Sequence, residues 1–125
     1  MTYLTLTLSL FWFANTPPSM CGLTSVVCYE ESPAYIQEYI KTEFDKAGLD
    51  GDRAVRLVKC ESDFKADAVS PTDDWGYFQW HRKYWSKIID ECFGNENQLE
   101  CEVKHAINKI KADGGMSAWS CNKKI

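Results

Sequence analysis

The sequence lacks the features that mark several large classes of protein. It contains no Cys-x-x-Cys pair, which argues against a zinc ribbon or a thioredoxin-type redox site. No internal repeat or low-complexity tract is present, and with 45% hydrophobic residues the chain is not intrinsically disordered. It also has no basic excess, since the net charge is −4, and this argues against binding to nucleic acid.

Long apolar runs are missing as well, and the one short run lies at the N-terminus. Leu4 to Ala14 is almost wholly apolar or hydroxylated, too short to span a bilayer as a helix but typical of the core of an export signal. A positive charge before it and a clear cleavage site are absent, so an uncleaved anchor or a buried segment stays open. We expect residues 1–20 to be a signal peptide and spacer, and residues 29–125 to form a single domain.

The six cysteines agree with export. An even number of cysteines in a small exported chain suggests three disulfides, although spacing alone does not select among the many pairings. Cys92, Cys101 and His105 also resemble part of a metal site, but the sequence offers no fourth ligand at a usual spacing. We therefore expect no metal.

Hydrophobic spacing predicts a mainly helical α+β fold with a small β region in the middle of the chain. Ser32 and Asp50 are expected to cap the first two helices, and Gly114 with Gly115 to end the last one. A short strand is expected at Gly76–Trp80. The expected helices are Pro33–Gly48, Asp52–Glu61, Tyr84–Cys92 and Leu99–Lys111.

Three carboxyl groups occupy contrasting settings in the stretch between Cys60 and Trp80. Glu61 ends a predicted helix, where the negative helix dipole and apolar neighbours raise the pKa of a carboxyl group, as a general acid requires. Asp73 and Asp74 lie in a polar turn that keeps carboxylates ionised. Spacing alone favours the plainer reading, a solvated glutamate at a helix end.

Four short boxes of residues follow one another along the chain. They are Glu61-Ser62-Asp63-Phe64 with Ala66 and Ala68, Asp74-Trp75-Gly76-Tyr77-Phe78-Gln79, Tyr84-Trp85, and Asn108-Lys109-Ile110 through Asp113-Gly114-Gly115-Met116 to Ala118-Trp119. In this order the boxes resemble the lysozyme superfamily, which includes the C-type lysozymes and the soluble lytic transglycosylases. The resemblance covers about residues 52–121. Each box alone is a weak signal, but four in order, in a chain with an export signal and disulfide-like cysteines, are strong.

The resemblance implies a lysozyme-like fold with a shortened β region and a role for each matching residue. Glu61 matches the general acid, and Asp74 the carboxylate that stabilises or captures the cationic sugar. Phe64 and Trp119 are candidates for the apolar wall beside the acid, and a register shift of one residue would exchange the roles of Asp73 and Asp74. Sugar contacts are implied for Gln79, Tyr84, Trp85, Asp113 and Trp119.

Two departures from the family pattern keep alternative functions open. The segment from Ala68 to Asp74 is shorter than in C-type lysozymes, which leaves a lytic transglycosylase that uses Glu61 alone as an alternative to a hydrolase. A non-catalytic glycan-binding relative is a third reading, which intact Glu61 and Asp74 speak against. His81 stands where the family usually has Asn, and we expect it to stand at a helix start rather than to contact substrate.

The resemblance also implies partners and crosslinks. A Cys60–Cys121 bridge would tie the acid helix to the C-terminal aromatic, Cys92–Cys101 would close a loop between helices, and Cys21–Cys28 would remain. The expected function is that of a secreted monomeric muramidase acting on peptidoglycan or a related N-acetylhexosamine polymer. No cofactor, nucleic acid or stable membrane partner is expected.

Overall fold

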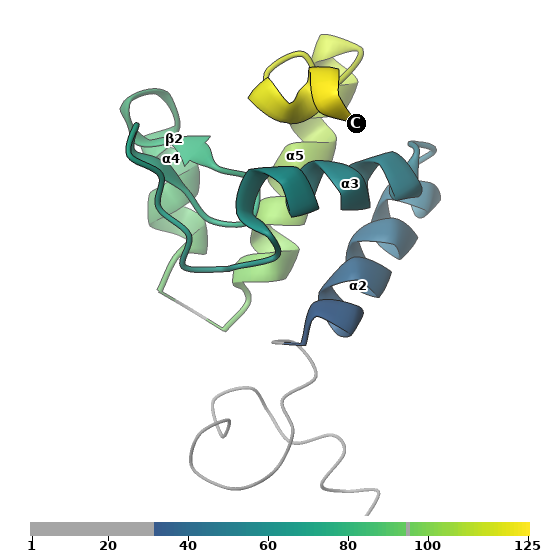
Figure 1. The fold of residues 1–125 in the computed structure, drawn as a ribbon, viewed down its shortest axis with the longest axis horizontal. Coiled ribbons are helices and arrows are strands. Elements are labelled where there is room, and N and C mark those ends of the chain that lie inside the picture. The colour runs from purple at the N-terminus through teal and green to yellow at the C-terminus, as the bar shows by residue number, and fades with distance from the viewer. Residues whose placement is uncertain (1–31, 95) are drawn as a thin grey trace, which may run out of the picture.

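A computed structural model describes residues 32–94 and 96–125. These residues form mainly helices, with a two-stranded antiparallel sheet at one edge, so the mainly helical α+β prediction is confirmed (Figure 1). The predicted signal segment and the Cys21–Cys28 pair lie outside the described residues. Among the helices of the described part, none is both long and apolar enough to cross a membrane.

The first two helices begin at the predicted caps. Helix α2 spans Pro33–Lys46, and the Ser32 hydroxyl accepts a hydrogen bond from the backbone N–H of Tyr35, the third residue of the helix. Helix α3 spans Gly51–Ser62, and the Asp50 carboxylate accepts the N–H of Arg53. Each helix buries one apolar stripe against the other, which places Glu61 near the end of a firmly packed helix.

The β region is smaller than predicted. Strand β1, Asp74–Trp75, pairs with strand β2, Trp80–His81, in the register Asp74 to His81 and Trp75 to Trp80. The expected strand at Gly76–Trp80 is wrong, because residues 76–79 form the turn between the two strands. Positive φ angles at Gly76 (+85°) and Gln79 (+55°) give the chain its reversal.

The carboxyl group of Glu102, in helix α5 (Gln98–Asp113), holds this turn through hydrogen bonds. Its oxygens accept the backbone N–H groups of Tyr77 (3.3 Å) and Phe78 (3.1 Å) and the indole N–H of Trp80 (3.1 Å). Gly76 is required there, since a Cβ at this position would lie 2.6 Å from a Glu102 oxygen. The buried side chain of Glu102 thus accepts hydrogen bonds from N–H groups that would otherwise be left unpaired in this turn.

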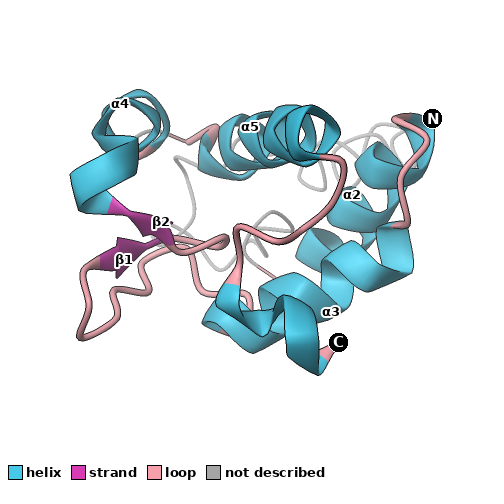
Figure 2. Cartoon of the chain, turned by 90° about the horizontal axis from the view of Figure 1, so that it is seen from above, coloured by secondary structure: helices cyan, strands magenta, loops and turns pink. Residues whose placement is uncertain are grey.

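Two helices complete the described fold. Helix α4 spans Arg82–Cys92 and helix α5 spans Gln98–Asp113, close to the predicted ranges. Gly114 ends α5 in the left-handed conformation (φ +76°), as predicted, and the chain finishes in the 3₁₀ helix η3, Ser120–Lys124. In Figure 2, α5 and α3 lie on opposite sides of the segment that leads back to η3.

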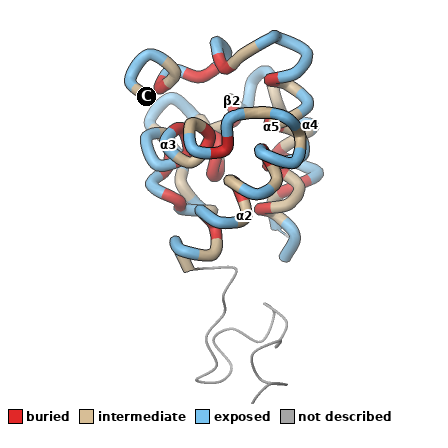
Figure 3. Tube along the Cα trace, turned by 90° about the vertical axis from the view of Figure 1, so that its right-hand side faces the viewer, coloured by how far each residue is buried: buried red, intermediate tan, exposed pale blue. Residues whose placement is uncertain are grey.

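The core lies between α2, α3, α5 and the aromatic turn. Buried and exposed residues alternate along these elements (Figure 3). The largest wholly enclosed side chains are those of Phe44 and Phe78. Two disulfides, Cys60–Cys121 and Cys92–Cys101, have the predicted pairing, and the first crosslinks α3 to η3 beside Glu61.

Candidate functional site

A cleft of about 270 Å³ opens between α3, the β region, α5 and the C-terminal segment. Its lining contains both carboxyl groups that the sequence analysis singled out, together with aromatic and hydroxyl side chains. The lining residues are Glu61, Thr72, Asp74, Gln79, Trp80, His81, Trp85, Lys109, Ala118, Trp119 and Ser120.

Glu61 projects from the last turn of α3 and is half-buried. Burial raises the pKa of its carboxyl group, and the nearby charge of Asp74 raises it further. The backbone N–H of Cys121, which donates to a Glu61 oxygen at 3.1 Å, acts in the opposite direction but does not reverse the shift. The setting therefore favours a protonated carboxyl group at higher pH than an ordinary glutamate.

Asp74 begins strand β1 and has the opposite character. Partial burial disfavours its charge, but hydrogen bonds from Thr72, Ser70 and His81 outweigh burial and lower its pKa. One oxygen accepts the Ser70 hydroxyl at 2.7 Å and the Thr72 hydroxyl at 2.5 Å, and the other faces Nδ1 of His81 at 3.0 Å. Hydrogen bonds from neighbouring side chains thus stabilise the ionised form of Asp74.

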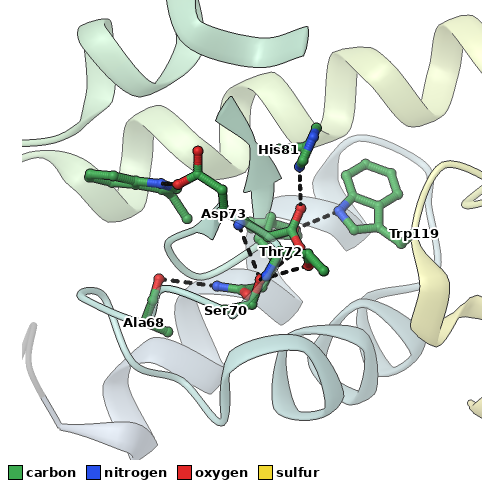
Figure 4. A network of polar contacts seen from close by, with 10 residues as sticks. Ala68, Ser70, Thr72, Asp73, His81 and Trp119 are labelled. Carbon is green, nitrogen blue, oxygen red and sulfur yellow. Dashed lines mark hydrogen bonds and ion pairs between the residues drawn. The ribbon is translucent and has the colours of Figure 1, made fainter. Parts of the chain in front are cut away.

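The structure also separates the roles of the two adjacent aspartates. Asp73 is exposed, has a positive φ of 65°, and accepts the indole N–H of Trp75 at 2.7 Å. Only Asp74 lines the cleft. Figure 4 shows Asp73 directed away from His81, while Ser70 and Thr72 lie beneath His81. Asp73 is a turn residue, and the register of the second box places Asp74 at the site.

The cleft wall beside the acid is aromatic. Trp119 lines it, as expected, and its indole N–H donates to the carbonyl of Phe78 at 2.8 Å. Trp80 packs edge-on against Trp119 and Trp85, with ring centroids 5.7 and 5.8 Å apart. Phe64, the other candidate for this wall, is buried in the core and does not line the cleft.

The remaining predicted sugar contacts divide into two groups. Gln79 and Trp85 line the cleft. The amide N–H₂ of Gln79 donates to the carbonyls of Ala68 and Gly76, so that it also braces the turn. Tyr84 is 69% exposed and lies outside the lining, as does Asp113, so a substrate contact by either stays a prediction.

Several lining residues, among them Lys109 and Thr72, were not predicted as part of the site, nor was Ser70, which lies outside the lining but donates to Asp74. Lys109 lies over the Trp85 ring, 4.9 Å from its centroid, and its ammonium group pairs with Asp113 one helical turn later. The spacing of Lys109 and Asp113 on one helix face was the available signal. Ser70 and Thr72 precede Asp74 by four and two residues in a predicted turn, a pattern typical of local hydrogen bonding to a carboxylate.

The structure supplies the fourth neighbour that the cysteine and histidine pattern lacked. Glu91 lies beside Cys92, Cys101 and His105, with Nε2 of His105 3.0 Å from a Glu91 oxygen. Both sulfur atoms, however, are joined in the Cys92–Cys101 disulfide. They are not available as thiolate ligands in this oxidised form.

The sequence is 27% identical over 119 aligned positions to Lysozyme P of Drosophila melanogaster, and the alignment covers 81% of this chain and 84% of that protein. No family model matches the chain, and no solved structure matches it. The two disulfides of the described residues fit a secreted protein. In sequence, the chain is thus similar to a lysozyme over most of its length.

Proposed function

We propose that this protein is a secreted muramidase that hydrolyses the β-1,4 glycosidic bonds of peptidoglycan. The observation that carries the proposal is the pair of carboxyl groups in one cleft whose environments move their pKa values apart. Burial raises the pKa of Glu61, while hydrogen bonding lowers that of Asp74. Glycosidases need this combination, because one group must give a proton while the other stays negative.

Glu61 is the general acid in this proposal. Its protonated carboxyl group donates to the glycosidic oxygen of the leaving sugar, and the resulting carboxylate needs stabilisation. The backbone N–H of Cys121, which already contacts a Glu61 oxygen at 3.1 Å, supplies it. The disulfide between the preceding residue, Cys60, and Cys121 fixes this donor relative to the acid.

Asp74 faces the positive charge that develops on the sugar ring. Both its oxygens are already hydrogen-bonded, one to hydroxyl groups and the other to His81. Such hydrogen bonds withdraw charge from a nucleophile, but they hold a carboxylate ionised and in a fixed orientation. This geometry favours electrostatic stabilisation of the cation, with covalent capture of the sugar as the other route open to Asp74.

The test is to incubate the oxidised protein with purified peptidoglycan and to identify the released fragments by mass spectrometry. We expect fragments with free reducing ends from the wild type, and a roughly 10²–10⁴-fold lower rate from Glu61→Gln. Glu38→Gln, the same change at an exposed position of α2, is the matched control and should keep full activity. Circular dichroism checks that both variants are folded.

The other outcomes are equally informative. Fragments lighter by one water would show a lytic transglycosylase, the alternative that the short segment before Asp74 suggests. Full activity in Glu61→Gln would exclude Glu61 as the acid. If the wild type cuts neither peptidoglycan nor chitin, a glycan-binding protein would replace the enzyme as the leading reading.

A further inference from the structure

The side chain of His81 lines the cleft and does not cap the helix that begins beside it. His81 is the N-cap residue of α4, as expected for a helix start, but its side chain makes no capping hydrogen bond. Instead Nδ1 lies 3.0 Å from an oxygen of Asp74, across the two-stranded ladder in which the two residues are direct partners. Figure 4 shows His81 pointing at the carboxylate above Ser70 and Thr72.

The chemistry of the contact fixes the tautomer. An ionised carboxylate only accepts hydrogen bonds, so Nδ1 of His81 must carry the proton that it shares with Asp74. The imidazole is then neutral if Nε2 is bare and cationic if Nε2 is also protonated. Neither change disturbs the Nδ1 contact, so the group beside Asp74 can change charge while the geometry stays the same.

The surroundings of His81 leave Asp74 as its dominant electrostatic partner. Its side chain is 35% exposed, and the Tyr84 ring lies against it with centroids 5.3 Å apart. Lys109 is already paired with Asp113. The charged or titratable groups that contact His81 or share its cleft are Asp74 of β1, Tyr84 of α4, Glu61 of α3 and Lys109 of α5.

We infer that His81 is a positioning residue that controls the charge available at Asp74. With a neutral imidazole, Asp74 presents a full negative charge to the sugar cation. With an imidazolium, the same hydrogen bond becomes an ion pair whose positive member also faces the cleft, so that the pair is nearly neutral. This inference rests on the proposed function, because the charge matters only if Asp74 faces a cationic sugar.

The consequence is a step in the activity at the pH where the imidazole of His81 changes charge. Below the step the enzyme retains Glu61 as acid but loses most of the stabilisation from Asp74. We expect kcat to fall by roughly tenfold across the step, as for a single unit charge brought near a cation in a partly shielded site. A residue that only shaped the β turn would produce no such step.

The decisive comparison is between the wild type and His81→Asn, since the Asn amide N–H₂ can keep a hydrogen bond to Asp74 without titrating. The kcat for peptidoglycan is measured from pH 4 to 9 for both, while the imidazole of His81 is titrated by NMR in the wild type and in Asp74→Asn. We expect a step in wild-type kcat at the NMR midpoint of His81 and none in His81→Asn. The midpoint should move to lower pH in Asp74→Asn, because the imidazolium loses its anionic partner.

Each part can overturn the inference separately. A step that persists in His81→Asn would assign it to another group, and an unchanged His81 midpoint in Asp74→Asn would show that the two groups are not coupled. Failure of the proposed function looks different, since the wild type would then cut no glycan at any pH. The catalytic role of His81 would fall with it, while the NMR midpoints would still decide the electrostatic coupling.

Discussion

The two described disulfides close loops of very different length, so their removal should have unequal costs. Cys60 and Cys121 are 61 residues apart in the sequence, whereas Cys92 and Cys101 are 9 apart. In the chain-entropy description, a crosslink stabilises the fold by restricting the unfolded chain, and the effect grows with the logarithm of loop length. For these separations the expected contributions are about 4.3 and about 2.6 kcal/mol.

The experiment replaces each pair by alanine and measures the free energy of unfolding in urea from tryptophan fluorescence. Alanine leaves no unpaired hydroxyl group at the buried positions Cys92 and Cys121. For a domain of this size we expect Tm to fall by roughly 15–30 °C without Cys60–Cys121 and by roughly 10–20 °C without Cys92–Cys101. Equal losses, or a larger loss for the short loop, would refute the reasoning.

The same pair of variants separates stability from catalysis. Cys121 donates its backbone N–H to Glu61, so freeing η3 from α3 should lower kcat even at a temperature where the variant is fully folded. Cys92–Cys101 crosslinks helices α4 and α5, and neither cysteine lines the cleft. Its removal should leave kcat within about twofold, as for other changes that spare the reacting groups. An equal loss of kcat in both variants would mean that general loosening, and not the position of the Cys121 donor, is responsible.

Two further predictions concern the turn and the acid. Gly76→Ala should destabilise the protein by about 2–4 kcal/mol, because the new side chain is strained at a positive φ and also clashes with its neighbours. Gly48→Ala, with a similar φ of +80° but open space around it, should cost about 1 kcal/mol. Urea unfolding compares the two variants, and equal losses would show that the turn yields to the extra methyl group. The activity should fall as pH rises through the raised pKa of Glu61, since the acid must be protonated, and Lys124→Gln should move this alkaline limb to higher pH by removing a cation that lowers that pKa. A pH profile of kcat/KM checks the shift, with the adjacent Lys123→Gln as control, and a limb that does not move would exclude this electrostatic influence.

The sequence predicted the helices because their signals are local. Ser32 and Asp50 cap helices within three residues of themselves, and apolar residues at helical spacing define the buried faces. The turn at Gly76–Gln79 was mistaken for a strand because Tyr77 and Phe78 have high strand propensity. The group that decides their conformation, Glu102, lies 24 residues beyond Phe78 and carries no local mark of that role.

In the candidate site, too, the features with a local sequence signal were predicted and those set by the three-dimensional arrangement were not. Glu61 and Asp74 were identified from their boxes, and the structure brings both into one cleft. Trp85 lines the cleft and Tyr84 is exposed, and the backbone of α4 leaves helical geometry at Trp85, a kink that the sequence analysis did not predict. The direction of the His81 side chain depends on the register of the two strands. The sequence did not define this register, because strands of two residues are too short to show an alternation of apolar and polar residues.

The partners of the two carboxyl groups come from different parts of the chain. Every hydrogen-bond donor to the Asp74 carboxylate lies within seven residues of it, between Ser70 and His81. The donors to Glu61 are the backbone N–H of Cys121, 60 residues away, and the side chain of the adjacent Ser120. Changes in η3 can therefore alter the hydrogen bonding of Glu61 without touching the donors to Asp74. Changes near Asp74 act on both groups, because the charge of Asp74 also raises the pKa of Glu61.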